Sequence, residues 1–148
     1  MAIEIENFSH VAMQVSNLDE SIAFYRDLLG LEMIMETRPE DFPEGAPRVH
    51  VVGCLVGTNV VIEFGVGLGP PGPVKTEGSP VLAFGVRDIE ETHQALLEAG
   101  VKPTMPPREM MPGLFMLFIQ DPDGRTIELA QFPDGALNNA EYNLGKKA

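Results

Sequence analysis

The stretch His10-Val11-Ala12-Met13-Gln14-Val15, followed by Asn17-Leu18-Asp19-Glu20, has a related copy later in the chain. The copy reads Val81-Leu82-Ala83-Phe84-Gly85-Val86, followed by Asp88-Ile89-Glu90-Glu91. Each copy leads into a helical pattern that stops at a glycine, Gly30 in the first and Gly100 in the second. A repeat that occupies both halves of a chain predicts two modules of the same design.

Strand-like segments follow the helical pattern in each half. In the first half we expect a helix over about residues 18–29 and strands over 31–35, 49–55 and 59–64. In the second half we expect a helix over about 89–99 and strands over 101–105, 114–120 and 126–132. Ser16 or Asn17 is expected to cap the first helix, and Asp88 the second. Each half therefore reads strand, helix and three strands, and the fold class is α+β.

The repeat also sets the expected domain organisation. The modules cover about residues 6–66 and 78–133, a Gly- and Pro-rich linker covers 67–77, and a C-terminal tail covers 134–148, where a short helix could form. Each module is too small to bury a core of its own. We therefore expect one domain over residues 1–148, with the two sheets lining a shared cleft.

The composition of the 148 residues excludes several classes of partner. Lys and Arg number 10 against 22 Asp and Glu, which gives a net charge of −12 and disfavours nucleic acid and anionic membranes. The single cysteine, Cys54, has no partner for an internal disulfide, and no apolar run has membrane-spanning length. The acidic N-terminal residues do not resemble a secretory signal. We expect a cytoplasmic protein.

Alternation along the strands separates two faces of each sheet. The bulky apolar residues on one face are expected to pack against the helices. The other face carries small residues together with His10, Gln14, Glu63 and Glu128. Glu63 and Glu128 are either residues of a wet sheet face, or, with His10, nitrogen and oxygen donors that converge on a divalent metal. Their equivalent places in the repeat favour the second interpretation.

Three segments resemble the vicinal oxygen chelate superfamily, the glyoxalase/bleomycin-resistance/extradiol-dioxygenase fold. They are 8–12, 18–31 and 121–129, which contain Phe24-Tyr25, Leu29-Gly30-Leu31 and Asp121-Pro122-Asp123-Gly124. The resemblance covers about residues 6–133. It implies a single glyoxalase-like domain of two βαβββ modules, whose sheets form an incomplete barrel around a metal.

The resemblance also implies a set of metal ligands. The family's ligand positions fall on His10, Glu63, Val81 and Glu128, and valine cannot bind a metal. The implied set is therefore His10, Glu63 and Glu128, with one divalent ion of zinc, nickel, manganese, cobalt or iron. His50 is a possible replacement ligand if its strand turns it toward the cleft.

The implied function is that of a metal-dependent lyase or isomerase of the glyoxalase kind. A small substrate would be chelated as an enolate or enediolate, with Glu63 or Glu128 as the catalytic base and Glu128 preferred as ligand. Two alternatives remain: an Fe(II) ring-cleaving dioxygenase, which Val81 disfavours, and a non-catalytic binding protein of the bleomycin-resistance kind. Relatives commonly dimerise, and open sheet edges favour a homodimer here as well.

Further residues are candidates for substrate binding. Gln14 shares the face of the proposed ligands, and Arg48 and Arg108 flank Pro-rich loops where they would meet a substrate anion. Met116 belongs to a methionine cluster that would form either core packing or a flexible apolar pocket wall. His93 on the second helix and Cys54 are interpreted as surface and core residues, respectively.

Overall fold

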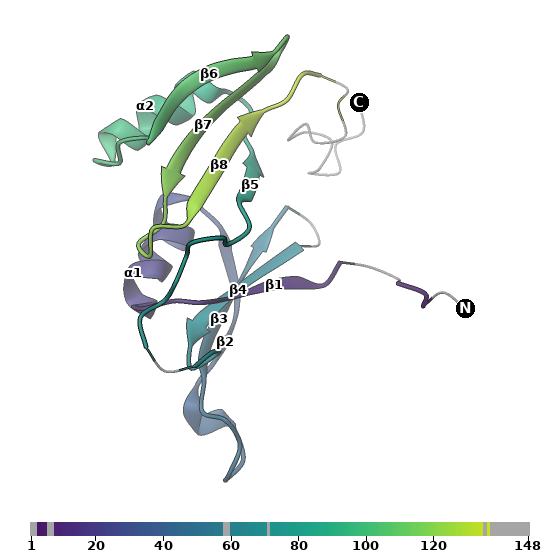
Figure 1. Cartoon of the computed structure of the whole chain (residues 1–148), viewed down its shortest axis with the longest axis vertical. Helices are drawn as coiled ribbons and strands as arrows, with labels where there is room; N and C mark the ends of the chain where they lie inside the picture. Colours follow the sequence, from purple (N-terminus) through teal and green to yellow (C-terminus); the bar gives the residue numbers. More distant parts are fainter. Residues whose placement is uncertain (1–2, 6–7, 58–59, 71, 135, 137–148) are drawn as a thin grey trace. The chain divides into compact units, whose positions relative to one another are not determined.

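The chain forms two compact units, Met1–Val74 and Lys75–Ala148 (Figure 1). A computed structural model describes residues 3–5, 8–57, 60–70, 72–134 and 136. The division falls within the predicted linker. Most of the predicted tail, including the expected short helix, lies outside the described residues. No helix in the described part of the chain is long and apolar enough to cross a membrane.

The first unit is a four-stranded sheet with one helical segment. Its elements are β1 (His10–Gln14), α1 (Leu18–Ile22), the π-helical η1 (Ala23–Leu28), β2 (Glu32–Thr37), the 3-10 turn η2 (Pro39–Asp41), β3 (His50–Val56) and β4 (Val60–Val66). The strand order is β1-β4-β3-β2, with β1 parallel to β4 and the other pairs antiparallel.

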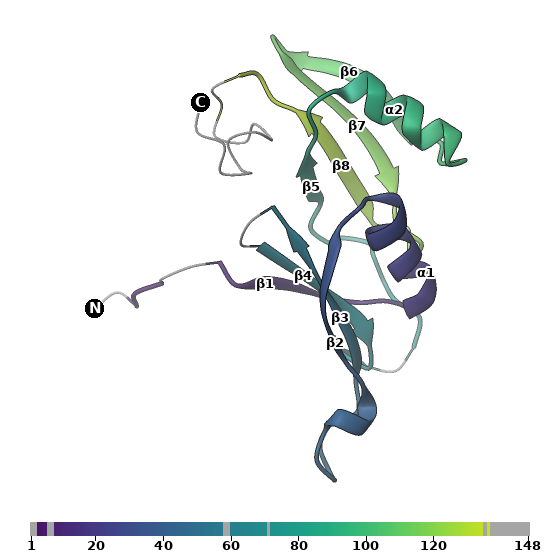
Figure 2. The same ribbon diagram turned by 180° about the vertical axis from the view of Figure 1, so that it is seen from behind.

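The second unit repeats this plan. Its elements are β5 (Leu82–Gly85), α2 (Ile89–Glu98), β6 (Met105–Met111), β7 (Leu114–Gln120) and β8 (Thr126–Gln131). The strand order β5-β8-β7-β6 matches that of the first unit, with β5 parallel to β8. Figure 2 shows α2 along one face of this sheet. The prediction of an α+β fold with two βαβββ modules is confirmed.

Both helices begin at the residues that the repeat indicates. The Asn17 side chain accepts a hydrogen bond from the Glu20 backbone N–H at 3.2 Å, and the Asp88 side chain accepts from the N–H groups of Glu90 and Glu91 at 2.9 Å. Gly30 and Gly100 follow the helices with positive φ, a conformation that glycine adopts without strain. The capping residues therefore fix where each helix leaves its sheet.

The first helix is not a regular α-helix, contrary to expectation. Its second part is π-helical, and the Leu29 backbone N–H donates to the Phe24 carbonyl at 3.0 Å. Two consecutive aromatic residues, Phe24 and Tyr25, are both buried there and pack edge to face at 5.0 Å between ring centroids. The Tyr25 ring also lies 5.0 Å from the Phe64 ring on β4. The wider turn thus brings both aromatic rings into the core.

The two sheets bury the faces that alternation predicts. In the first unit the buried strand residues include Met13, Ile62 and Phe64. In the second unit they include Leu117, Ile119, Ile127 and Leu129, which share the core with Ile89 and Leu96 of α2. Because successive side chains alternate, the residues between them face away from the helices.

The first strand after α2 differs from its prediction. We expected residues 101–105, whereas β6 covers Met105–Met111 and pairs with β7 across a turn at Gly113, whose φ is +78°. Hairpin pairing with β7 therefore determines this strand, although Pro106 and Pro107 disfavour it locally. The two prolines are tolerated because β6 is an edge strand of its sheet.

A buried ionic turn connects β7 to β8. Arg125 Nη1 lies 3.1 Å from Asp121 Oδ2 and 3.4 Å from Asp123 Oδ2, and all three side chains are at most 7% exposed. Asp121 Oδ1 also accepts from the backbone N–H groups of Asp123 and Arg125. Asp121 therefore satisfies both the buried charge of Arg125 and the backbone of the turn.

Asp121→Asn should destabilise the protein by about 3 kcal/mol, because it leaves the Arg125 charge buried with less compensation. Urea unfolding followed by circular dichroism measures this change. Asp27→Asn is the matched control, since Asp27 forms an exposed pair with Arg26 at 2.6 Å, and its unfolding midpoint should stay unchanged. Equal effects of the two substitutions would contradict a structural role for the buried turn.

Candidate functional site

His10 and Glu63 lie together on the face of the first sheet that points away from α1. β1 and β4 run parallel in the register His10↔Val61 and Ala12↔Glu63. This register places His10 Nε2 3.8 Å from Glu63 Oε2, with the two side chains 43% and 24% exposed. The first unit thus brings two of the three predicted metal ligands together.

Ser9 contacts the other ring nitrogen of His10, and no motif in the sequence indicates this contact. Its Oγ lies 2.9 Å from His10 Nδ1. A histidine that binds a metal through one nitrogen is commonly oriented by a hydrogen bond at the other nitrogen. Ser9 therefore leaves Nε2, the nitrogen that faces Glu63, available for a ligand.

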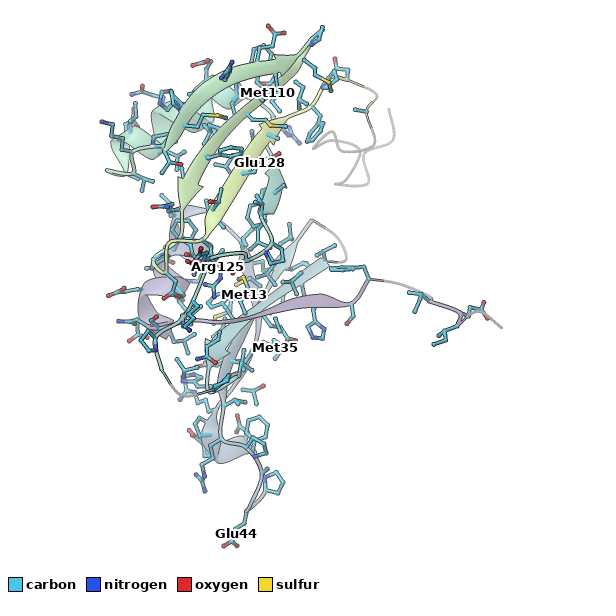
Figure 3. All side chains as sticks on the ribbon, viewed as in Figure 1. Met13, Met35, Glu44, Met110, Arg125 and Glu128 are labelled. Atoms are coloured by element: carbon cyan, nitrogen blue, oxygen red, sulfur yellow. The ribbon has the colours of Figure 1, made fainter. Side chains whose placement is uncertain are left out.

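Met35 shares the sheet face of Glu63 and lies over Gly53, the residue between them. Gly53 on β3 pairs with both Glu63 and Met35, and a Cβ atom at residue 53 would lie 2.5 Å from Met35 Cγ. The glycine thus leaves room for the Met35 side chain, which Figure 3 labels on β2. A glycine within a strand often marks such a close approach, and this signal was available in the sequence.

Glu128 occupies the equivalent place in the second unit. β5 and β8 pair in the register Ala83↔Glu128, which matches Ala12↔Glu63 in the first unit. Figure 3 labels Glu128 on β8. Glu128 is half-buried and points away from the buried face of Ile127 and Leu129. The structure therefore confirms that Glu63 and Glu128 hold equivalent strand positions.

Val81 is the counterpart of His10. It directly precedes Leu82, which pairs with Ile127, as Val11 pairs with Ile62 in the first unit. Val81 is 51% exposed. The two units thus differ in composition at the same position: the first has a histidine beside its glutamate, and the second has an apolar side chain.

The Gln14 side chain forms a hydrogen bond with the segment that follows β4. Its Nε2 donates to the Pro70 carbonyl at 3.4 Å, and a Cβ atom at Gly69 would lie 2.5 Å from its Oε1. Gln14 therefore holds residues 69–70 against the end of β1. Its predicted contact with substrate stays a prediction.

Arg108 lies within a strand and not beside a loop, contrary to expectation. It belongs to β6 and pairs with Met116 on β7. Arg108 is exposed and Met116 is half-buried. Arg48, by contrast, is an exposed residue of the irregular segment before β3. The substrate contacts predicted for these three residues stay predictions.

His50 does not share the face of Glu63. His50 lies two and four residues before the buried Val52 and Cys54 on β3, so the three side chains share one face. Glu63 points to the opposite face of the sheet. His50 Nε2 lies 2.7 Å from Glu36 Oε1, and Glu36 also accepts two hydrogen bonds from Arg38. His50 is therefore part of an ionic cluster remote from Glu63 in this unit.

Cys54 takes the core place expected of it, whereas His93 is less exposed than the surface residue that we expected. Cys54 is fully buried, and burial raises the pKa of its thiol. A raised pKa disfavours the reactive thiolate. His93 lies half-buried on α2.

The donor chemistry of the described residues fits a divalent metal. In the described part of the chain, no group of three or more His, Cys, Asp or Glu side chains is gathered as a metal site. The first unit supplies an adjacent imidazole and carboxylate, and the second supplies the equivalent carboxylate. Imidazole and carboxylate ligands suit zinc, nickel, manganese, cobalt and iron.

The fold and the motif positions agree with sequence comparison. Residues 7–129 match the Glyoxalase/Bleomycin resistance protein/Dioxygenase superfamily. The chain belongs to this superfamily. A probable lactoylglutathione lyase of Synechocystis sp. is 34% identical over 124 residues, which cover 82% of this chain and 92% of the relative.

Solved structures of the superfamily resemble the chain as well. A glyoxalase family protein from Enterococcus faecalis is 29% identical with a TM-score of 0.65, and the match covers 85% of this chain and 98% of that one. The trypanothione-dependent glyoxalase I of Leishmania major is 27% identical with a TM-score of 0.67, over 96% of this chain and 92% of that one.

Glu36→Gln should reduce stability at neutral pH but not in acid. The hydrogen bonds from Arg38 and His50 lower the pKa of the Glu36 carboxyl. A carboxyl whose pKa is lowered by folding stabilises the protein above its unfolded-state pKa, and this contribution is lost as the pH falls through the folded-state pKa. The thermal midpoints of variant and wild type should therefore differ at neutral pH and converge in acid. Glu32→Gln, at an exposed residue of the same strand, should show no such pH dependence.

Proposed function

We propose that this protein is a metal-dependent lyase or isomerase of the glyoxalase kind that acts on a small molecule. The observation that carries the proposal is the matched register Ala12↔Glu63 and Ala83↔Glu128, together with His10 Nε2 at 3.8 Å from Glu63. The naming of the Synechocystis relative as a probable lactoylglutathione lyase supports an enzyme of this class.

His10, Glu63 and Glu128 would hold one divalent metal ion. When bound, such an ion acts as a Lewis acid toward a substrate oxygen. Ser9 would fix the orientation of the His10 ring through Nδ1. The absence of a histidine at Val81 leaves fewer protein ligands than an imidazole pair would supply, at a cost in metal affinity.

A glutamate carboxylate would carry the proton transfer. Glu63 or Glu128 would accept the proton from a carbon next to a substrate carbonyl and return it to the neighbouring position. Glu63 is only 24% exposed, and the apolar Met35 lies over the neighbouring Gly53 on the same sheet face. Such an environment limits the access of water to the exchanging proton. Glu128, whose motif matches the family more strongly, is assigned as the ligand.

A second candidate function is non-catalytic binding of a small molecule. The exposed valine at position 81 favours it, because an apolar residue replaces one of the positions that would otherwise bind metal. Ligand binding that is unchanged by a metal chelator, without turnover, would support this candidate against the first.

Purified full-length protein should contain about one divalent metal ion per chain, and Glu128→Gln should weaken metal binding by roughly 100-fold. Inductively coupled plasma mass spectrometry and competition with a chelating dye measure stoichiometry and affinity. Glu98→Gln, at an exposed residue of α2, is the matched control and should bind as the wild type does. Failure to bind zinc, nickel, manganese, cobalt or iron would exclude the metal-dependent function.

Ser9→Ala should weaken metal binding by about tenfold while leaving the stoichiometry unchanged. The serine contacts the ring nitrogen that does not face Glu63, so its loss frees the ring to rotate without removing a ligand. The same dye competition measures the change. Ser79→Ala, at a residue of the second unit, serves as the control. An affinity equal to that of the wild type would show that Ser9 does not position His10.

A further inference from the structure

Arg108 reaches the sheet face of Glu128 because β6 contains a bulge. Met105 pairs with Phe118, and Arg108 pairs with Met116, with a register shift between the two pairs at Pro106 and Pro107. In a regular strand, residues 105 and 108 would point to opposite faces. The extra residue in β6 reverses this parity, as bulges do where they redirect a side chain.

Arg108 and Glu128 therefore share one face, with apolar side chains between them. Phe118 pairs with Glu128, and Met116 pairs with Arg108, so both occupy the central strand β7 on this face. Both are half-buried, and Met105 of β6 pairs with Phe118. The face thus presents a cation at one corner, a carboxylate at the other and an apolar floor between.

The cation is not neutralised by its sequence neighbour. Glu109 pairs with Phe115, which places it on the opposite face, and its side chain accepts the Gly113 N–H at 3.1 Å. In a protein with net charge −12, a local guanidinium is needed for an anion to approach. Arginine is also the side chain best suited to hold a carboxylate through two hydrogen bonds.

The apolar side chains between Arg108 and Glu128 determine which kind of substrate body can bind there. Arg108 lies two strands away from Glu128 and is offset from it by two residues along the strands. These spacings place their Cα atoms about 12 Å apart. A peptide laid over Phe118 and Met116 would lose water from its amides without gaining polar partners on this floor, at a cost in free energy. An aliphatic or aromatic body would instead bury apolar surface there.

We propose that the substrate is a carboxylate with an apolar body, held by Arg108 at its anionic end and by Phe118 and Met116 along its length. The inference rests on the proposed function, since it takes Glu128 as a ligand of the metal at which the substrate would react. This substrate class differs from an adduct of a peptide thiol such as glutathione, which the name of the Synechocystis relative indicates for that protein.

Isothermal titration of the full chain with three probes tests the inference. The probes are 4-phenylbutanoate, its neutral counterpart 4-phenylbutan-1-ol, and S-methylglutathione. The acid should bind roughly tenfold or more tightly than the alcohol, because only the acid forms a charge-assisted bond. It should also shift the methyl resonances of Met105 and Met116 in a protein labelled at its methionine methyl groups.

Arg108→Gln should abolish the preference for the acid, and Lys102→Gln, which removes the same charge from the exposed segment before β6, should keep it. The inference is overturned if acid and alcohol bind equally, if no probe binds, or if S-methylglutathione binds more tightly than the acid. It is also overturned if Arg48→Gln, and not Arg108→Gln, removes the preference.

The metal content of the same preparations separates the two proposals. A protein that binds none of the five metals on loading, yet retains the Arg108-dependent preference for the acid, would refute the metal-dependent function and leave the binding face in place. A metal-loaded protein without that preference would refute the substrate class alone.

Discussion

The parallel pairing of the first and last strands in each unit is the constraint on which the candidate site depends. Burial of Ile62 and Phe64 against the helical side fixes the face of β4, and the same holds for Ile127 and Leu129 of β8. Since side chains alternate along a strand, Glu63 and Glu128 must then face the other way. A register slip of one residue would bury these carboxylates in an apolar core, at a large cost in free energy.

The same constraint makes the two units equivalent in geometry but different in chemistry. The register places an alanine beside each glutamate, Ala12 in one unit and Ala83 in the other. At the next equivalent position, however, one unit has His10 and the other has Val81. The first unit therefore has an imidazole beside its carboxylate, whereas the second joins a single carboxylate to an apolar surface. A repeated fold can in this way carry different side chains at the same position of its two copies.

The sequence was sufficient to predict most of the fold, because local signals agreed with the burial pattern. Asn17, Asp88, Gly30 and Gly100 mark the helix ends, and alternation identifies the buried faces. His50 is also readable in retrospect, since it lies two residues before the buried Val52 and so shares its face. These predictions depend only on neighbours in sequence and on apolar burial.

The remaining features depend on pairing between distant segments. The π-helical turn at Phe24 and Tyr25 arises because both rings find space in the core, which no helix propensity encodes. The face of Arg108 cannot be obtained by counting residues, because the bulge at Pro106 and Pro107 changes the parity that counting assumes. The bulge depends on the partner strand β7, whose register is held by β8. Arg108, the residue that we propose to bind the substrate anion, is thus placed by a bulge that the sheet tolerates at its edge.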